Sequence, residues 1–173
     1  KNIIIQEFYN GKELKLSEIV SKINDRVLKE KGNIENYLTG ILCRINHSEL
    51  ELVNAGHPYP FYYSKNTNTA EILDNKSENR CGVIGILGLP AKFESITLEM
   101  HSGDELIFYT DGITEITNKE NIPFGKNALF NSFQRHMEEN LQNQVDLILQ
   151  DVKDYIGEEK TNDDISIIIL KKK

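Results

Sequence analysis

Acidic residues stand at the ends of two strongly apolar segments of the sequence. Asp111 follows the segment 105–110, whereas Asp163 and Asp164 precede the segment 165–170. If these segments form neighbouring antiparallel strands, the end of one lies beside the start of the other, and the carboxylates meet at one sheet edge. Carboxylates gathered without Cys or His suit a hard divalent cation such as Mg²⁺ or Mn²⁺. The sequence therefore predicts an acidic, metal-binding edge.

Each half of this pattern also has a plain structural interpretation. The dipeptide Asp111-Gly112 is a common turn at the end of a strand. Acidic residues such as Asp163-Asp164 often precede strands in loops. Taken together the two segments favour a shared site, but the residues alone leave both interpretations open.

A second candidate is the loop 54–58, Asn-Ala-Gly-His-Pro, which directly follows a predicted strand. Its small residues permit the backbone to approach a ligand closely. His57 could act as an acid or a base, or contact phosphate. The alternative is a turn whose histidine is only solvated or hydrogen-bonded. Asn54, Gly56 and His57 are therefore candidate residues near a site.

Composition limits the classes of protein that fit. The 173 residues are 39% hydrophobic and 27% charged, which is typical of one soluble globular domain spanning 1–173. The net charge of −7 and the absence of a basic face argue against nucleic-acid binding. No apolar run approaches the roughly 18 residues of a membrane span, and the lysines at 171–173 indicate a solvated tail. Cys43 and Cys81 are expected to be reduced thiols of a cytoplasmic protein.

The order of apolar patterns predicts an α+β protein. A helix is expected at 17–31, with Ser17 as its N-cap and Gly32 at its end. In the segment 49–54, Glu49, Glu51 and Val53 alternate with Leu50, Leu52 and Asn54, which indicates a sheet with one wetter face. Residues 64–82 are expected to form a mobile loop around one short strand. The remaining predictions are strands at 38–46, 49–54, 61–63, 70–73, 93–100, 105–110 and 165–170, and helices at 126–139 and 144–156.

Several motifs occur in an order that resembles the phosphatase domain of the bacterial stage II sporulation E type. This group belongs to the PP2C-like, metal-dependent protein serine/threonine phosphatases. The element Tyr-Thr-Asp-Gly-Ile-Thr-Glu at 109–115 is highly specific, and the resemblance covers essentially the whole chain. The other matching segments are Tyr37-Leu38-Thr39-Gly40, the loop 54–58, Leu87-Gly88, Ser102-Gly103-Asp104, Phe124-Gly125 and Asn162-Asp163-Asp164-Ile165-Ser166.

The resemblance implies an α-β-β-α sandwich of two antiparallel sheets stacked face to face, with helices outside. It implies a pair of Mn²⁺ or Mg²⁺ ions that activate water against phosphoserine or phosphothreonine. Asp111 and Asp163 match the family's metal-ligand and catalytic aspartates, and Asp164 fills the neighbouring position. The implied substrate is a phosphorylated regulatory protein of the anti-sigma-factor-antagonist kind.

The sequence also departs from the family pattern. Family members begin with two further acidic motifs, a Gly-Asp segment and an Asp before Gly-His-Gly, and residues 1–15 resemble the helix and linker that follow them. We therefore expect a domain truncated at its N-terminus, with weak metal binding and little activity in this chain alone. Open sheet edges would favour a homodimer. The alternatives are a catalytically inactive, partner-binding module of the same fold, or an unrelated α+β domain with accidental acidic turns.

Overall fold

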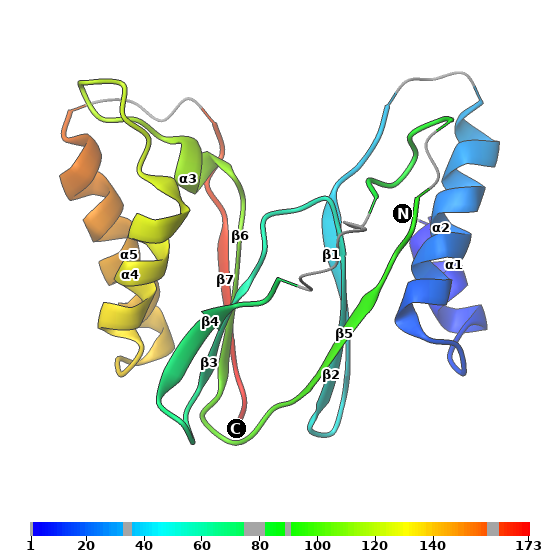
Figure 1. Ribbon diagram of the computed structural model, residues 1–173, viewed down its shortest axis with the longest axis horizontal. Helices are drawn as coiled ribbons and strands as arrows, with labels where there is room; N and C mark the ends of the chain where they lie inside the picture. Colours follow the sequence, from blue (N-terminus) through cyan, green and yellow to red (C-terminus); the bar gives the residue numbers. More distant parts are fainter. Residues whose placement is uncertain (1, 33–35, 75–81, 89–90, 159–162) are drawn as a thin grey trace. The chain divides into compact units, whose positions relative to one another are not determined.

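The computed structural model describes residues 2–32, 36–74, 82–88, 91–158 and 163–173 (Figure 1). The chain divides into two compact units: unit 1 comprises 1–57 and 75–100, and unit 2 comprises 58–74 and 101–173. Each unit contains one antiparallel sheet with helices packed on it, which confirms the predicted α+β class with two sheets flanked by helices. Residues 75–81, which include Cys81 and most of the second half of the expected loop, lie outside the described residues.

Unit 2 is built on a four-stranded sheet with the strand order β4-β3-β6-β7. All three strand pairs are antiparallel, and Tyr109 at the end of β6 pairs with Ile167 at the start of β7. The predicted pairing of these two segments is therefore confirmed. The elements are β3 (Phe61–Ser64), β4 (Thr69–Ile72), β6 (Glu105–Tyr109), α3 (Gly112–Glu115), α4 (Gly125–His136), α5 (Leu141–Ile156) and β7 (Ile167–Lys171).

The helices α4 and α5 pack against each other, and α5 also contacts β7, as the left part of Figure 1 shows. Phe61 lies at the centre of the core they cover, with its ring centroid 4.9 Å from that of Tyr109 and 6.2 Å from that of Phe133. Burial of such large aromatic side chains contributes strongly to the folding of this unit. Among the described residues, no helix is both long and apolar enough to cross a membrane.

The start of α5 differs from the prediction. The helix begins at Leu141 rather than at residue 144, because the side chain of Asn140 accepts a hydrogen bond from the Asn143 amide at 3.0 Å and caps it. Gly157 ends the helix as expected. Gln144 is fully buried inside α5 and donates to Glu105 on β6 at 2.9 Å. The polar residues at 140 and 144 therefore cap the helix α5 and join it to β6.

Unit 1 is built on a three-stranded antiparallel sheet with the order β1-β2-β5. β1 and β2 form the predicted hairpin, and His47 in its turn has a positive φ of 56°. A first helix occupies the region where the resemblance implied one. The elements are α1 (Asn2–Asn10), α2 (Leu16–Lys31), β1 (Gly40–Asn46), β2 (Glu49–Ala55) and β5 (Ser95–Glu99).

The helix α2 packs on β1 and β2 through an apolar stripe at helical spacing. Leu16, Ile19 and Ile23 are at most 1% exposed and share one core with Val53 of β2. The expected helix is confirmed, but its first residue is Leu16 and its N-cap is Lys15, so the prediction that Ser17 caps it was wrong. The amide of Lys15 donates to the Glu18 carboxylate at 2.9 Å.

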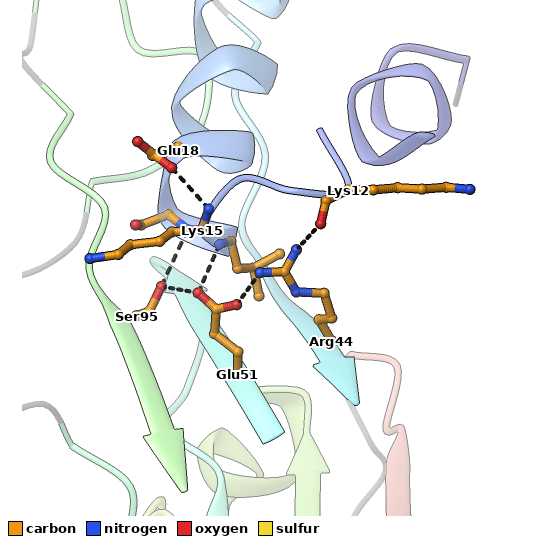
Figure 2. Close-up of polar contacts among 8 residues, drawn as sticks. Lys12, Lys15, Glu18, Arg44, Glu51 and Ser95 are labelled. Carbon is orange, nitrogen blue, oxygen red and sulfur yellow. Dashed lines mark hydrogen bonds and ion pairs between the residues drawn. The ribbon is translucent and has the colours of Figure 1, made fainter. Parts of the chain in front are cut away.

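The side chain of Lys15 makes no capping hydrogen bond to the helix. Glu51, in the middle of β2, binds the start of the helix instead (Figure 2). Its Oε1 accepts hydrogen bonds from the Leu16 amide at 2.7 Å and from the Ser95 hydroxyl at 2.8 Å. Ser95 in turn accepts from the Ser17 amide at 3.2 Å. The other carboxylate oxygen of Glu51 lies 2.5 Å from the Arg44 guanidinium on β1. One carboxylate thus joins all three strands of the sheet to the positive end of a helix.

This network overturns the expectation of a wetter sheet face at Glu51. Glu51 is only 9% exposed, and every residue of β2 after Glu49 is buried. Burial alone raises the pKa of Glu51. The hydrogen bonds donated by Leu16, Ser95 and Arg44 outweigh this effect and hold the pKa below its ordinary value of 4.5. The alternating pattern gave a wrong prediction because Glu51, although charged, has its hydrogen-bond partners inside the unit.

We predict that Glu51→Gln lowers the free energy of unfolding at neutral pH by about 1–3 kcal/mol, because the amide cannot pair with Arg44 and leaves buried groups unsatisfied. A lowered pKa in the folded state means that Glu51 contributes its full stabilisation above about pH 4.5. That contribution is lost as the pH falls from 4.5 through the folded-state pKa. Urea unfolding from pH 7 to pH 3 should therefore show the variant and wild type converging in acid.

The matched control is Glu49→Gln, at the exposed first position of the same strand. It should leave the unfolding curve nearly unchanged at every pH. A Glu51→Gln protein as stable as wild type at pH 7 would show that the network does not hold the helix.

Candidate metal-binding edge

The end of β6 and the segment leading into β7 are joined side by side by Thr110. Its amide donates to the Ser166 carbonyl at 3.1 Å, and its hydroxyl oxygen accepts from the Ser166 amide at 2.9 Å. The same hydroxyl donates to the Asp164 carbonyl at 3.1 Å. These contacts place Asp111, the next residue along the chain, at the same edge as Asp163 and Asp164.

Gly112 shows how closely the two backbones approach. A Cβ added there would lie 2.5 Å from the Asp164 carbonyl oxygen and 3.5 Å from the Asp163 Cβ. Because real Cβ atoms do not come so close to backbone oxygen, only glycine fits without a shift. The segment is therefore more than a turn: Asp111 precedes the short helix α3, and its carbonyl accepts from the Thr114 amide at 2.8 Å and the Glu115 amide at 2.9 Å.

The three carboxylates at this edge are exposed and make few contacts of their own. Asp163 accepts a hydrogen bond from the Asp164 amide at 2.7 Å. Within the described residues, the carboxylates of Asp111 and Asp164 have no hydrogen-bond or ion-pair partner. Exposed carboxylates without protein partners have oxygens available for a ligand.

The donor atoms at this edge match a hard divalent cation in kind but not in number. All are oxygens, with no thiolate or imidazole among them, which is the chemistry that Mg²⁺ and Mn²⁺ prefer. However, no group of three or more His, Cys, Asp or Glu side chains within the described ranges is arranged to hold a metal ion. Asp111, Asp163 and Asp164 thus fit part of a coordination sphere, and the remaining ligands would have to come from water, phosphate or further protein groups.

Residues 54–57 of the loop belong to unit 1, whereas the acidic edge belongs to unit 2. The side chain of Asn54 closes the loop, because its Oδ1 accepts from the His57 amide and its Nδ2 donates to the His57 carbonyl, both at 2.8 Å. Gly56 has a φ of +77°, and a Cβ there would lie 2.6 Å from a methyl carbon of Val83. The loop is a locked turn with a half-buried histidine, and the role of His57 stays a prediction.

The contacts that define the acidic edge were only partly visible in the sequence. The acidic residues were identified by their positions beside apolar strands. Thr110, which binds the two strand ends together through both its backbone and its hydroxyl, was overlooked. A hydroxyl residue directly before Asp-Gly at a strand end is the signal that would have indicated it. Asn24 was also overlooked; it is 7% exposed and accepts from the Gly85 amide at 2.8 Å, fixing a loop of unit 1.

Comparison with solved structures identifies this fold. The PP2C domain of SiaA from Pseudomonas aeruginosa superposes with a TM-score of 0.78 at 16% identity, covering 98% of this chain and 66% of that chain. The phosphatase domain of the cell fate determinant SpoIIE from Bacillus subtilis, presoaked with manganese, gives 0.62 at 17% identity, covering 99% and 72%. The catalytic domain of the serine threonine protein phosphatase PstP, in complex with two manganese ions, gives 0.57 at 12% identity, covering 97% and 78%.

These likenesses show that the chain has the PP2C phosphatase fold. The chain spans just under two thirds of the length of the SiaA domain. A comparison with curated proteins found no match. The sequence profile described as Stage II sporulation protein E (SpoIIE) matches residues 3–173, nearly the whole chain. The chain therefore belongs to the Stage II sporulation protein E family, as its motifs indicated.

Proposed function

We propose that this chain forms part of a metal-dependent protein serine/threonine phosphatase. The observation that carries the proposal is the pairing of β6 with β7. It brings two acidic segments that are far apart in the sequence to one sheet edge. Membership of the SpoIIE family supports it. So do two structures with the same fold, one presoaked with manganese and one in complex with two manganese ions.

In this proposal Asp111 and Asp163 hold the metal, and Asp164 supports them from the adjacent position. Gly112 lets the two backbones approach closely, which supports the proposal that the carboxylates share a cation. When bound, Mn²⁺ or Mg²⁺ supplies Lewis-acid activation of water and neutralises charge on the phosphoryl group. Phosphoryl transfer needs little covalent help from protein side chains. Carboxylates that hold a metal ion are therefore the right type of group for this reaction, and no Ser or Cys nucleophile is needed.

The substrate in this proposal is a phosphoserine or phosphothreonine on a bacterial regulatory protein of the anti-sigma-factor-antagonist kind. The domain then acts in cytoplasmic signal transduction. A chain of net charge −7 repels phosphate, and a bound cation offsets that repulsion locally. Asn54, Gly56 and His57 are proposed to lie near the substrate, with His57 as a phosphate contact or as an acid or base.

A catalytically inactive, partner-binding module of the same fold is the second candidate. It is favoured by one observation, namely that the carboxylates in the described ranges do not form a group of three that could hold an ion. In that case the acidic edge has a structural or recognition role. Metal titration separates the two candidates.

We predict weak but measurable binding of Mn²⁺ in a calorimetric titration of the chain. Asp111→Asn and Asp163→Asn should each reduce the affinity at least about ten-fold, because loss even of a group that only orients a ligand costs that much. The matched control is Asp25→Asn, which removes an exposed carboxylate from α2 of unit 1. Equal Mn²⁺ affinity of wild type and Asp111→Asn would exclude this edge as the metal site.

Gly112→Ala tests the close approach without removing a charge. The added methyl group must push the Asp164 carbonyl away, so we expect a lower Mn²⁺ affinity and a free energy of unfolding reduced by about 1–3 kcal/mol. Gly40→Ala is the control, because a Cβ at Gly40 meets no atom within 4 Å. If Gly112→Ala behaves like Gly40→Ala in both titration and urea unfolding, the close approach is not what shapes the edge.

We also predict little hydrolysis of p-nitrophenyl phosphate by this chain in the presence of Mn²⁺. The sequence contains no Gly-His-Gly segment, which the family places after a further metal-ligand aspartate, so fewer carboxylates hold the ions. Robust manganese-dependent hydrolysis that Asp111→Asn abolishes would contradict this expectation and show that the chain completes its own site.

A further inference from the structure

The hydroxyl group of Thr110 joins the end of β6 to the segment that leads into β7. Its oxygen accepts a hydrogen bond from the Ser166 amide at 2.9 Å, and the hydroxyl donates to the Asp164 carbonyl at 3.1 Å. A hydroxyl group carries one donor and two acceptor sites, so both bonds can form at once. The Thr110 amide also donates to the Ser166 carbonyl at 3.1 Å. The side chain therefore adds two hydrogen bonds to a contact that the backbone makes without it.

The backbone of Asp164 connects Thr110 to the carboxylate of Asp163. The Asp164 carbonyl accepts from the Thr110 hydroxyl and lies against Gly112, where an added Cβ would come within 2.5 Å of the carbonyl oxygen. The amide of the same residue donates to Oδ1 of Asp163 at 2.7 Å. Because only two soft dihedral angles separate the amide from the carbonyl of one residue, a contact that fixes the carbonyl also restrains the amide. The Asp163 carboxylate is thus linked to the Thr110 hydroxyl through a single residue.

We infer that Thr110 is a positioning residue for the proposed metal site, and that its hydroxyl group acts by fixing the Asp164 backbone and, through it, the Asp163 carboxylate. The inference rests on the proposed function. Thr110 also directly precedes Asp111, so this one residue is joined to both acidic segments, by the chain to one and by its hydroxyl group to the other. Groups that orient a metal ligand without touching the ion typically change the metal affinity by about 10–100-fold when they are removed.

A purely structural role for Thr110 makes a different prediction. Threonine is β-branched and suits a strand end by its shape alone. In that case the hydroxyl group contributes to folding but not to the affinity for a cation. Thr110→Val separates the two roles, because valine keeps the branched shape and the backbone amide and loses only the hydroxyl group. Thr110→Ser is the complementary variant, since it keeps the hydroxyl group and loses the methyl group.

The first test is the affinity of the chain for Mn²⁺, measured by calorimetric titration. Thr110→Val should weaken binding at least about ten-fold, whereas Thr110→Ser should stay close to the wild-type affinity. Thr97→Val is the matched control, because Thr97 is exposed on β5 of unit 1, and it should bind like wild type. Urea unfolding in the presence of EDTA should show that every variant is folded under the conditions of the titration.

The second test asks whether Thr110 acts through Asp163. In a chain that already carries Asp163→Asn, Thr110→Val should cost little further Mn²⁺ affinity, because the carboxylate that the hydroxyl group orients has been removed. Two substitutions that act independently would instead lower the affinity by the product of their separate factors. The electron paramagnetic resonance signal of free Mn²⁺ measures the weak binding of these variants.

The third test needs no metal and reports the contact itself. The Ser166 amide donates to the Thr110 hydroxyl, so its hydrogen exchange, followed by NMR, should be faster in Thr110→Val than in wild type or Thr110→Ser. The amides within β7 should exchange at wild-type rates in all three proteins, because the backbone pairing with β6 remains.

Four outcomes would each overturn the inference. They are equal Mn²⁺ affinity of Thr110→Val and wild type, equal losses in Thr110→Val and Thr110→Ser, independent losses in the Asp163→Asn chain, and unchanged exchange of the Ser166 amide. Failure of the proposed function gives a different result: wild type itself binds no Mn²⁺, or Asp163→Asn binds it as tightly as wild type. In that case the assignment of Thr110 falls together with the site.

Discussion

The antiparallel pairing of β6 with β7 is the constraint on which the candidate site depends. A shift of one residue in this pairing would turn every β7 side chain to the opposite face, sending Ile167 and Ile169 out of the core. The register is fixed at both ends by polar contacts. Buried Glu105 lies 2.6 Å from the ammonium group of Lys171, and Thr110 joins Ser166 and Asp164 at the other end. Fixing the register fixes where the aspartates lie.

The sequence predicted those features that depend on neighbouring residues. Alternating and helical patterns located the helices and strands, and the acidic ends of two apolar strands located the edge. It did not predict the Thr110 contacts or the role of Glu51, because these rest on partners far along the chain. Ser17 is a good local cap by type, yet the Leu16 amide is satisfied by a carboxylate 35 positions away. The start of the helix therefore depends on a tertiary contact, which the residue types around position 17 do not predict.

Two sets of carboxylates in this chain differ in their partners. Glu51, Asp104 and Glu105 are at most 9% exposed, and each accepts at least two hydrogen bonds or an ion pair from fixed neighbours. Their charge is used up in holding helices and strands together, as an unpaired buried charge would be too costly. The aspartates at the acidic edge lie beside backbone that Thr110 and Gly112 hold in close contact, and they keep oxygens without partners. Carboxylate oxygens that no protein group occupies are expected of a ligand-binding carboxylate rather than a structural one, because a hard cation binds through such oxygens.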